Sequence, residues 1–144
     1  KLRKNPACSI CGEHPTILNL KDTAVFCAVH EAVEMPIPMD WQLDPITLSM
    51  RIKSGEKICL IDVRDPVERE IVEIPGSVNI TYERIISQMD ELDKTTPLIF
   101  ICRNGIRSER VVRRLRSQGF NNAYNLKGGT NGWVNSIDSS QMNY

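Results

Sequence analysis

The stretch LIFICRNGIRSERVVRRL, residues 98–115, decides the fold. Its first part is a short, continuous apolar run that reaches Cys102, and such a run is typical of a buried strand. Its last part places apolar side chains at helical spacing among arginines, which predicts a helix over residues 108–118. A loop, residues 103–107, separates the two. The thiol therefore stands where a strand ends and a helix is about to begin.

Strands and helices alternate on both sides of this unit, from Trp41 onward. Further strands are expected in residues 57–63, 77–80 and 122–126. Helices are expected after Asp44 and over residues 81–92, because Asp and Thr are suitable N-caps, and a short helix or turn is expected at 127–133. This alternation predicts an α/β fold with a central, mainly parallel sheet flanked by helices.

The composition limits the class of protein. A chain of 144 residues with 41% hydrophobic and 25% charged residues is long enough for one ordinary domain. Its 18 Lys and Arg balance 18 Asp and Glu, so net charge indicates no partner such as nucleic acid. No apolar run approaches the ~20 residues that span a bilayer, and we expect no membrane association. Five cysteines are an odd number, which argues against a disulfide framework and favours a reducing, cytoplasmic compartment.

The surroundings of Cys102 favour a reactive thiol. In parallel α/β sheets, ligands bind beyond the carboxyl ends of the strands. A loop that leads into a helix can aim backbone N–H groups at one point there, and Gly105 permits the tight backbone. Arg103 and Arg107 add positive charge, which favours the nucleophilic thiolate. The alternative is that Cys102 is a small core residue, which is our interpretation of Cys59 in the middle of a predicted strand.

Several blocks of the sequence together resemble a rhodanese domain. They are LIDVRDPVERE (60–70), IPGSVNI (74–80), the Cys102 loop and LKGGTNGW (126–133). The resemblance runs from about Trp41 to Trp133 and implies a single rhodanese-like domain over 41–136, without a cofactor of its own. It also implies a sulfurtransferase that carries a persulfide on Cys102. Glu73 departs from the pattern, because the family commonly has histidine before IPG.

The same resemblance implies roles for the residues around the thiol. The loop would bind the anionic persulfide through backbone amides and arginines, and Asp62 and Arg64 would support the loop or its rim by ion pairing. The loop residues concerned are Arg103, Asn104, Gly105, Ile106, Arg107 and Ser108. Two alternatives stay open: an inactive rhodanese module that docks a partner, and a phosphatase or arsenate reductase. The related phosphatase loop is C-x5-R, whereas Arg107 makes this loop C-x4-R, which suits a sulfur species better.

The amino-terminal segment carries a possible half of a zinc site. Cys8 and Cys11 form a C-x2-C pair, and Cys27 and His30 could complete four ligands by spacing alone. NPACSICGEHPTI, residues 5–17, also resembles the end of an adenylyltransferase of the molybdopterin-synthase-activating (ThiF/MoeB) type, in which a second C-x2-C pair lies far upstream. That resemblance implies a structural zinc in the full-length protein.

The two resemblances together imply a two-domain parent protein. Residues 1–40 would be the tail end of the adenylyltransferase domain and a linker, and residues 137–144 a carboxyl-terminal tail. The first residue is lysine, so we expect the chain to be part of a longer protein. The acceptor would be the C-terminus of a ubiquitin-like sulfur-carrier protein in molybdopterin or thiamine biosynthesis, and the donor thiosulfate or a cysteine desulfurase. We expect a solvent-facing persulfide, with Arg107, Arg110 and Arg114 as a docking face or an ordinary solvated one.

Overall fold

The computed structural model describes residues 5–10, 12–16 and 37–144, and the chain divides into two units, Lys1–Pro36 and Ile37–Tyr144. In the second unit five described strands form one sheet in the order β1-β5-β4-β2-β3, and every ladder is parallel. The strands are β1 (Gln42–Leu43), β2 (Cys59–Asp62), β3 (Val78–Asn79), β4 (Leu98–Ile101) and β5 (Ala123–Leu126). The predicted α/β fold with a parallel sheet is confirmed.

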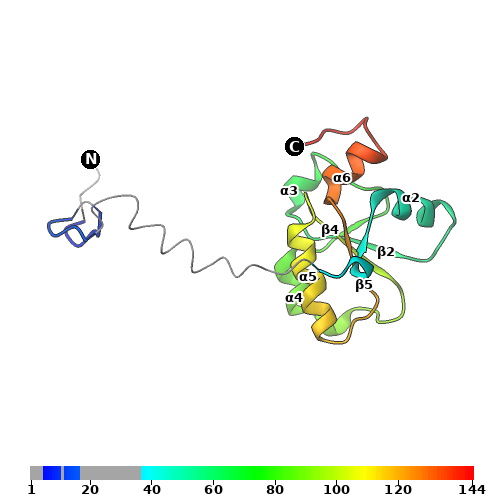
Figure 1. The fold of residues 1–144 in the computed structure, drawn as a ribbon, viewed down its shortest axis with the longest axis horizontal. Coiled ribbons are helices and arrows are strands. Elements are labelled where there is room, and N and C mark those ends of the chain that lie inside the picture. The colour runs from blue at the N-terminus through cyan, green and yellow to red at the C-terminus, as the bar shows by residue number, and fades with distance from the viewer. Residues whose placement is uncertain (1–4, 11, 17–36) are drawn as a thin grey trace. The chain divides into compact units, whose positions relative to one another are not determined.

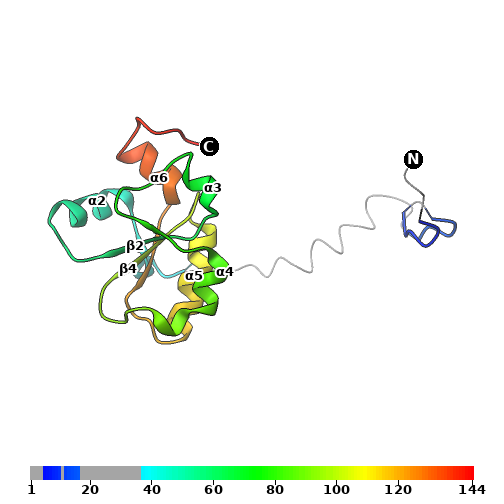
Figure 2. The ribbon, with the colours of Figure 1, turned by 180° about the vertical axis from the view of Figure 1, so that it is seen from behind.

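Helices cover both faces of this sheet (Figures 1 and 2). They are α2 (Pro45–Lys53), α3 (Pro66–Arg69), α4 (Tyr82–Ser87), α5 (Ile106–Ser117) and α6 (Gly129–Ser136), with 3-10 turns η2 (Met39–Trp41) and η3 (Met89–Glu91). Helices α4 and α5 contact each other, as do α2 and α6. Within the described residues, no helix is long and apolar enough to cross a membrane.

The alternation of side chains along the strands divides the core into two clusters. Ile61 and Phe100 belong to the cluster that includes α5, whereas Leu60, Ile99 and Ile101 belong to the cluster that includes Leu48 of α2 and Trp133 of α6. Strand β4 is buried along its whole length because it lies at the centre of the sheet and is covered on both sides. This rigid strand fixes the position of the residue that follows it, Cys102.

Two predicted helices differ from the observed ones. Helix α5 begins at Ile106, two residues before the predicted start, because Gly105 in the left-handed region serves as its N-cap. The helix predicted over 81–92 ends at Ser87 and continues as η3, since Gln88 has non-helical torsions. Ser87 Oγ donates to the carbonyl of Arg84 at 3.0 Å, a contact that competes with regular helical hydrogen bonds.

Candidate active site

Cys102 lies immediately past the carboxyl end of β4, at the sheet edge where the sequence predicts it. Its Sγ accepts a hydrogen bond from the backbone N–H of Gly105 at 3.1 Å and lies 3.2 Å from Ser108 Oγ. Both donors would stabilise a negative charge on sulfur more than a neutral thiol. The residue is 0% exposed, so the thiol that would carry the expected solvent-facing persulfide is itself buried. Core packing from Val63, Val111 and their neighbours surrounds it.

Gly105 gives the loop its shape. Its φ of 92° lies in the left-handed region, where side chains with a Cβ are strained. A Cβ at this position would also lie 3.2 Å from the backbone nitrogen of Gly128. This conformation turns the Gly105 N–H toward Sγ and starts α5. The loop proper is therefore Cys102–Gly105, and Arg107 belongs to the first turn of the helix rather than to the loop.

Ser108 connects the thiol to strand β5. Its Oγ lies 2.7 Å from Asn125 Oδ1 as well as 3.2 Å from Cys102 Sγ, and all three residues are buried. A hydroxyl has a single proton, so it donates to one of these acceptors at a time. Donation to sulfur adds a second hydrogen bond to that from the Gly105 N–H, and donation to Asn125 links α5 to β5.

The amino end of α6 holds the main chain of the loop. The backbone N–H groups of Thr130 and Asn131 donate to the carbonyls of Cys102 and Arg103, at 2.8 and 3.0 Å. Gly129 makes this close approach feasible, because a Cβ there would lie 2.1 Å from the Cys102 carbonyl oxygen. The LKGGTNGW block thus supports the loop through its backbone.

The two loop-associated arginines have definite partners. Arg107 donates to both carboxylate oxygens of Glu68, at 2.7 and 2.6 Å. Its hydrogen bonds are the main reason why the pKa of Glu68 falls from 4.5 to about 2, against the opposing effect of burial. Arg103 is exposed and places its guanidinium 4.6 Å from the centre of the Tyr144 ring. Asn104 and Ile106 are both exposed.

Asp62 and Arg64 form a buried ion pair at the end of β2, beside β4. Arg64 Nη2 lies 2.6 Å from Asp62 Oδ2, and the two side chains are 0% and 1% exposed. Arg64 also donates to the carbonyl of Val72 at 2.7 Å and to the hydroxyl of Tyr144 at 2.6 Å. With these partners the buried guanidinium is neutralised and extensively hydrogen-bonded, which a buried charge requires. The pair therefore contributes no free charge to the site.

Some residues of the site were not identified from sequence reasoning. Glu68, Asn125, Gly129 and Tyr144 all contact the loop or its arginines, and none was assigned a role there. A signal existed for Glu68: Asp65 and Glu68 have the D-x-x-E spacing of a capping box, which the structure shows at the start of α3. That box orients Glu68, whose other contacts reach Arg107. The contacts of Asn125 and Tyr144 depend on tertiary structure alone.

The predicted docking arginines and the predicted zinc ligands lie in different parts of the chain. Arg110 and Arg114 are exposed on α5, and Arg110 lines a pocket of about 260 Å³ together with Arg107, Val63, Asp65, Tyr82 and Glu83.

In the first unit, residues 5–16 include a hydrogen-bonded turn in which Gly12 N–H donates to the carbonyl of Cys8 at 2.8 Å. A Cβ at Gly12 would lie 2.5 Å from that carbonyl oxygen, so glycine permits this close approach. Cys11, Cys27 and His30 lie outside the described residues.

Comparison with known proteins agrees with this geometry. The family model described as "Rhodanese-like domain" matches residues 45–136. The rhodanese-like domain protein of Staphylococcus aureus has a TM-score of 0.59 and 25% identity, and covers 64% of this chain and 89% of its own. A human single-domain sulfurtransferase has a TM-score of 0.57 and 25% identity, with coverages of 67% and 96%.

Curated relatives at similar identity are longer proteins. An adenylyltransferase and sulfurtransferase of Debaryomyces hansenii is 30% identical over 160 residues, covering 100% of this chain and 36% of that protein. A probable adenylyltransferase/sulfurtransferase of Mycobacterium tuberculosis is 30% identical over 145 residues, with coverages of 99% and 36%. This chain thus spans about a third of the length of these relatives. From its fold, its loop and the match over 45–136, the chain belongs to the rhodanese-like domain family.

Proposed function

We propose that this chain is a sulfurtransferase domain that carries a persulfide on Cys102. The observation that carries the proposal is a cysteine sulfur at the carboxyl edge of a parallel sheet, with the Gly105 N–H directed at it and the Ser108 hydroxyl, which can also donate to it, 3.2 Å away. Such preorganised donors stabilise developing negative charge on sulfur. The sulfurtransferase activity named for its relatives supports the same class of reaction.

The proposed reaction has two steps. In the first, the Cys102 thiolate attacks the outer sulfur of a donor such as thiosulfate, a new S–S bond forms, and sulfite leaves with the electron pair of the broken bond. In the second, a nucleophilic acceptor takes the outer sulfur, and the electron pair returns to Sγ. The charge on the terminal persulfide sulfur is what the loop must stabilise between these steps, and the N–H of Gly105 is the nearest donor on the backbone.

We propose that the acceptor is the C-terminus of a ubiquitin-like sulfur-carrier protein, and that a cysteine desulfurase can replace thiosulfate as donor. The support is the combination of adenylyltransferase and sulfurtransferase in the names of the longer relatives. The pocket that Arg107 and Arg110 of α5 line could receive an extended acceptor peptide. Tyr82 supplies an aromatic wall and Glu83 limits its positive charge.

One observation favours a second function, that of an inactive docking module. Cys102 is 0% exposed, so a donor must displace neighbouring side chains or the loop before it reaches Sγ. A steady-state assay of sulfur transfer to cyanide, with thiosulfate and then with a desulfurase persulfide as donor, separates the two functions. Turnover with either donor supports the sulfurtransferase. A folded protein that transfers no sulfur from either donor would establish the docking module.

We also propose that Cys8 and Cys11 are half of a structural zinc site whose other ligands belong to the longer protein. The support is the C-x2-C spacing of Cys8 and Cys11, which is typical of half a zinc site. Among the described residues no group of three or more His, Cys, Asp or Glu side chains is placed to hold a metal. Zinc measured by elemental analysis in the longer protein should fall when both cysteines are replaced by serine. An unchanged zinc content would refute this proposal.

A further inference from the structure

The segment that follows α6 returns to the carboxyl edge of the sheet. Gln141 Oε1 accepts from the backbone N–H of Glu73 at 3.0 Å, and Asn131 Nδ2 donates to the main-chain oxygen of Tyr144 at 3.0 Å. Arg103 Nε also donates to that main-chain oxygen. The end of the chain labelled C lies near α3 and α6 in Figure 1, and the contact of Tyr144 with Glu68 confirms the approach to α3. Tyr144 therefore sits at the rim of the Cys102 site.

The side chain of Tyr144 contacts three of the charged groups there. Its ring lies against the Arg103 guanidinium, with 4.6 Å from Cζ to the ring centre. Its hydroxyl accepts from Arg64 Nη1 at 2.6 Å and donates to Glu68 Oε1 at 3.2 Å. The ring is thus held on one side by a cation and at its polar end by a buried guanidinium and a carboxylate.

These contacts join the two arginines that flank the thiol. Glu68 receives the hydroxyl of Tyr144 and both hydrogen bonds of Arg107, while the ring of the same tyrosine supports Arg103. Arg103 follows Cys102 directly, and Arg107 is in the first turn of α5. An arginine without such partners must be ordered when an anion binds, and that loss of side-chain freedom weakens binding. Tyr144 therefore helps to order Arg103 directly and Arg107 through Glu68, which the capping box of α3 also orients.

We propose that Tyr144 is a positioning residue of the sulfur-transfer site, which fixes Arg103 directly and Arg107 through Glu68 so that an anionic sulfur donor meets two ordered cations. The inference rests on the proposed function. It concerns the binding of the anion rather than the reactivity of sulfur, because no contact joins Tyr144 to Sγ among those described around Cys102.

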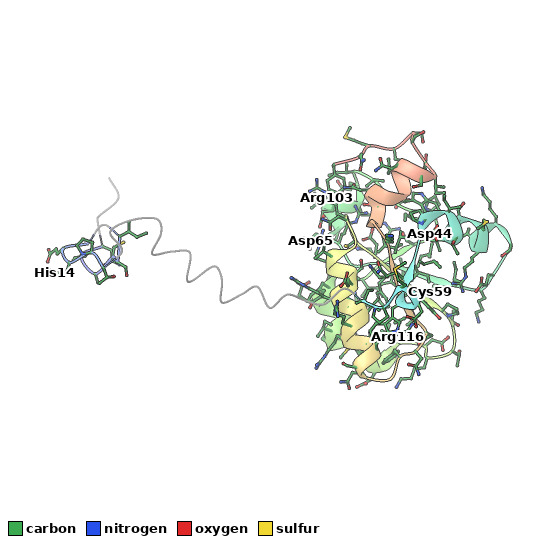
Figure 3. The ribbon with its side chains drawn as sticks, viewed as in Figure 1. His14, Asp44, Cys59, Asp65, Arg103 and Arg116 are labelled. Atoms are coloured by element: carbon green, nitrogen blue, oxygen red, sulfur yellow. The ribbon has the colours of Figure 1, made fainter. Side chains whose placement is uncertain are left out.

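The kinetic test compares Tyr144→Leu, Tyr144→Phe and Tyr124→Leu in the full chain. Tyr144→Leu should raise KM for thiosulfate roughly tenfold, the scale of one cation–π contact plus one hydrogen bond. Its kcat and its KM for dithiothreitol, a neutral acceptor, should stay within about twofold. Tyr144→Phe keeps the ring on Arg103 and should show an intermediate KM. Tyr124 of β5 lies 5.1 Å from the guanidinium of Arg116, measured to the ring centre, and Figure 3 shows Arg116 far from Arg103. Tyr124→Leu is therefore the matched control and should leave KM unchanged.

A second measurement does not depend on sulfur transfer. The rates at which Cys102 is alkylated by anionic iodoacetate and by neutral iodoacetamide are measured by peptide mass spectrometry, and their ratio reports the positive charge ordered near the thiol. Tyr144→Leu should lower this ratio about threefold or more, whereas Tyr124→Leu should not. A lowered ratio in a protein that transfers no sulfur would support the positioning role and reject the proposed function. An unchanged ratio in folded Tyr144→Leu protein, or equal changes in kcat and KM, would overturn the inference.

Discussion

Two cysteines on neighbouring parallel strands, Cys59 and Cys102, differ in the end of the strand at which they lie. Cys59 opens β2 at the amino edge of the sheet and pairs in register with Leu98, whereas Cys102 follows β4 at the carboxyl edge. Cys59 is half-buried, and its pKa is raised by burial and by the charge of Asp93. Cys102 is more deeply buried, yet two donors are directed at its sulfur. The edge of the sheet, rather than exposure, distinguishes the candidate nucleophile.

The largest expected effect comes from replacing the thiol at the carboxyl edge, Cys102. Cys102→Ser should reduce sulfur transfer to the uncatalysed background, because a serine oxygen cannot form the persulfide. The isosteric change should alter the free energy of unfolding by no more than about 1.5 kcal/mol. Activity and denaturant unfolding of the variant check both statements. Substantial turnover by folded Cys102→Ser would place the sulfur carrier elsewhere.

A substitution at Gly105 should separate the roles of the two sheet edges, because it disturbs only the carboxyl edge. Gly105→Ala strains a residue at φ 92° and brings its Cβ within 3.2 Å of Gly128 N, so the loop must shift and move its N–H away from Sγ. We expect a loss of about 1–3 kcal/mol in stability and of tenfold or more in transfer. Gly55→Ala is the matched control, because Gly55 has φ 75° with nothing within 4 Å of its Cβ. It should lose about 1–2 kcal/mol of stability and keep its activity. Equal activity losses in the two variants would reject a local role for Gly105.

Glu68→Gln tests the charge at the rim with a smaller expected effect. Glutamine can keep the capping box of α3 but removes the ion pair with Arg107, so transfer should fall roughly three- to tenfold.

Acid unfolding gives a second readout of the same carboxylate. The pKa of Glu68 is lowered to about 2 in the folded chain, so its contribution to stability is complete above its usual value of 4.5 and is lost as the pH falls toward 2. Wild-type protein should therefore lose more stability than Glu68→Gln across this window, as measured by denaturant unfolding at each pH. Parallel stability curves for the two proteins would contradict the assignment.

The smallest effect is expected at the amino edge. Cys59→Ala removes a half-buried sulfur that packs against the core, so we expect a loss of about 1 kcal/mol in stability and no change in transfer beyond about twofold. Thermal unfolding and the transfer assay measure the two quantities. A large loss of activity with intact stability would give Cys59 a chemical role and remove the distinction between the edges.

The sequence predicts the central part of the fold because the signals there are local. The apolar run of β4, the Asp44 and Pro45 start of α2 and the apolar face of α5 each specify their own element. The boundaries of α5 were predicted less well, since the left-handed Gly105 can serve as N-cap as well as a loop glycine. Strand β1 was missed because two residues that pair only with β5 leave no periodic pattern.

For the candidate site, too, the sequence predicts the residues with local signals and misses those brought in by tertiary structure. Cys102, Gly105 and Arg107 lie within six consecutive residues. The strand–loop–helix pattern places them together at the carboxyl edge of the sheet. Tyr144 and Asn125 reach the loop from other parts of the chain, 41 and 17 residues away from Arg103 and Ser108. Local sequence patterns do not predict the burial of Cys102 either, because it results from packing between β4, α5 and α6.

The most direct test of the account is to locate the transferred sulfur. Wild type and Cys59→Ala are incubated with thiosulfate or with a loaded desulfurase, the excess donor is removed, and the chain is mapped by peptide mass spectrometry under non-reducing conditions. The account predicts one additional sulfur atom on the peptide that contains Cys102, in both proteins. An additional sulfur on the Cys59 peptide instead, or an unmodified Cys102 with both donors, would contradict it.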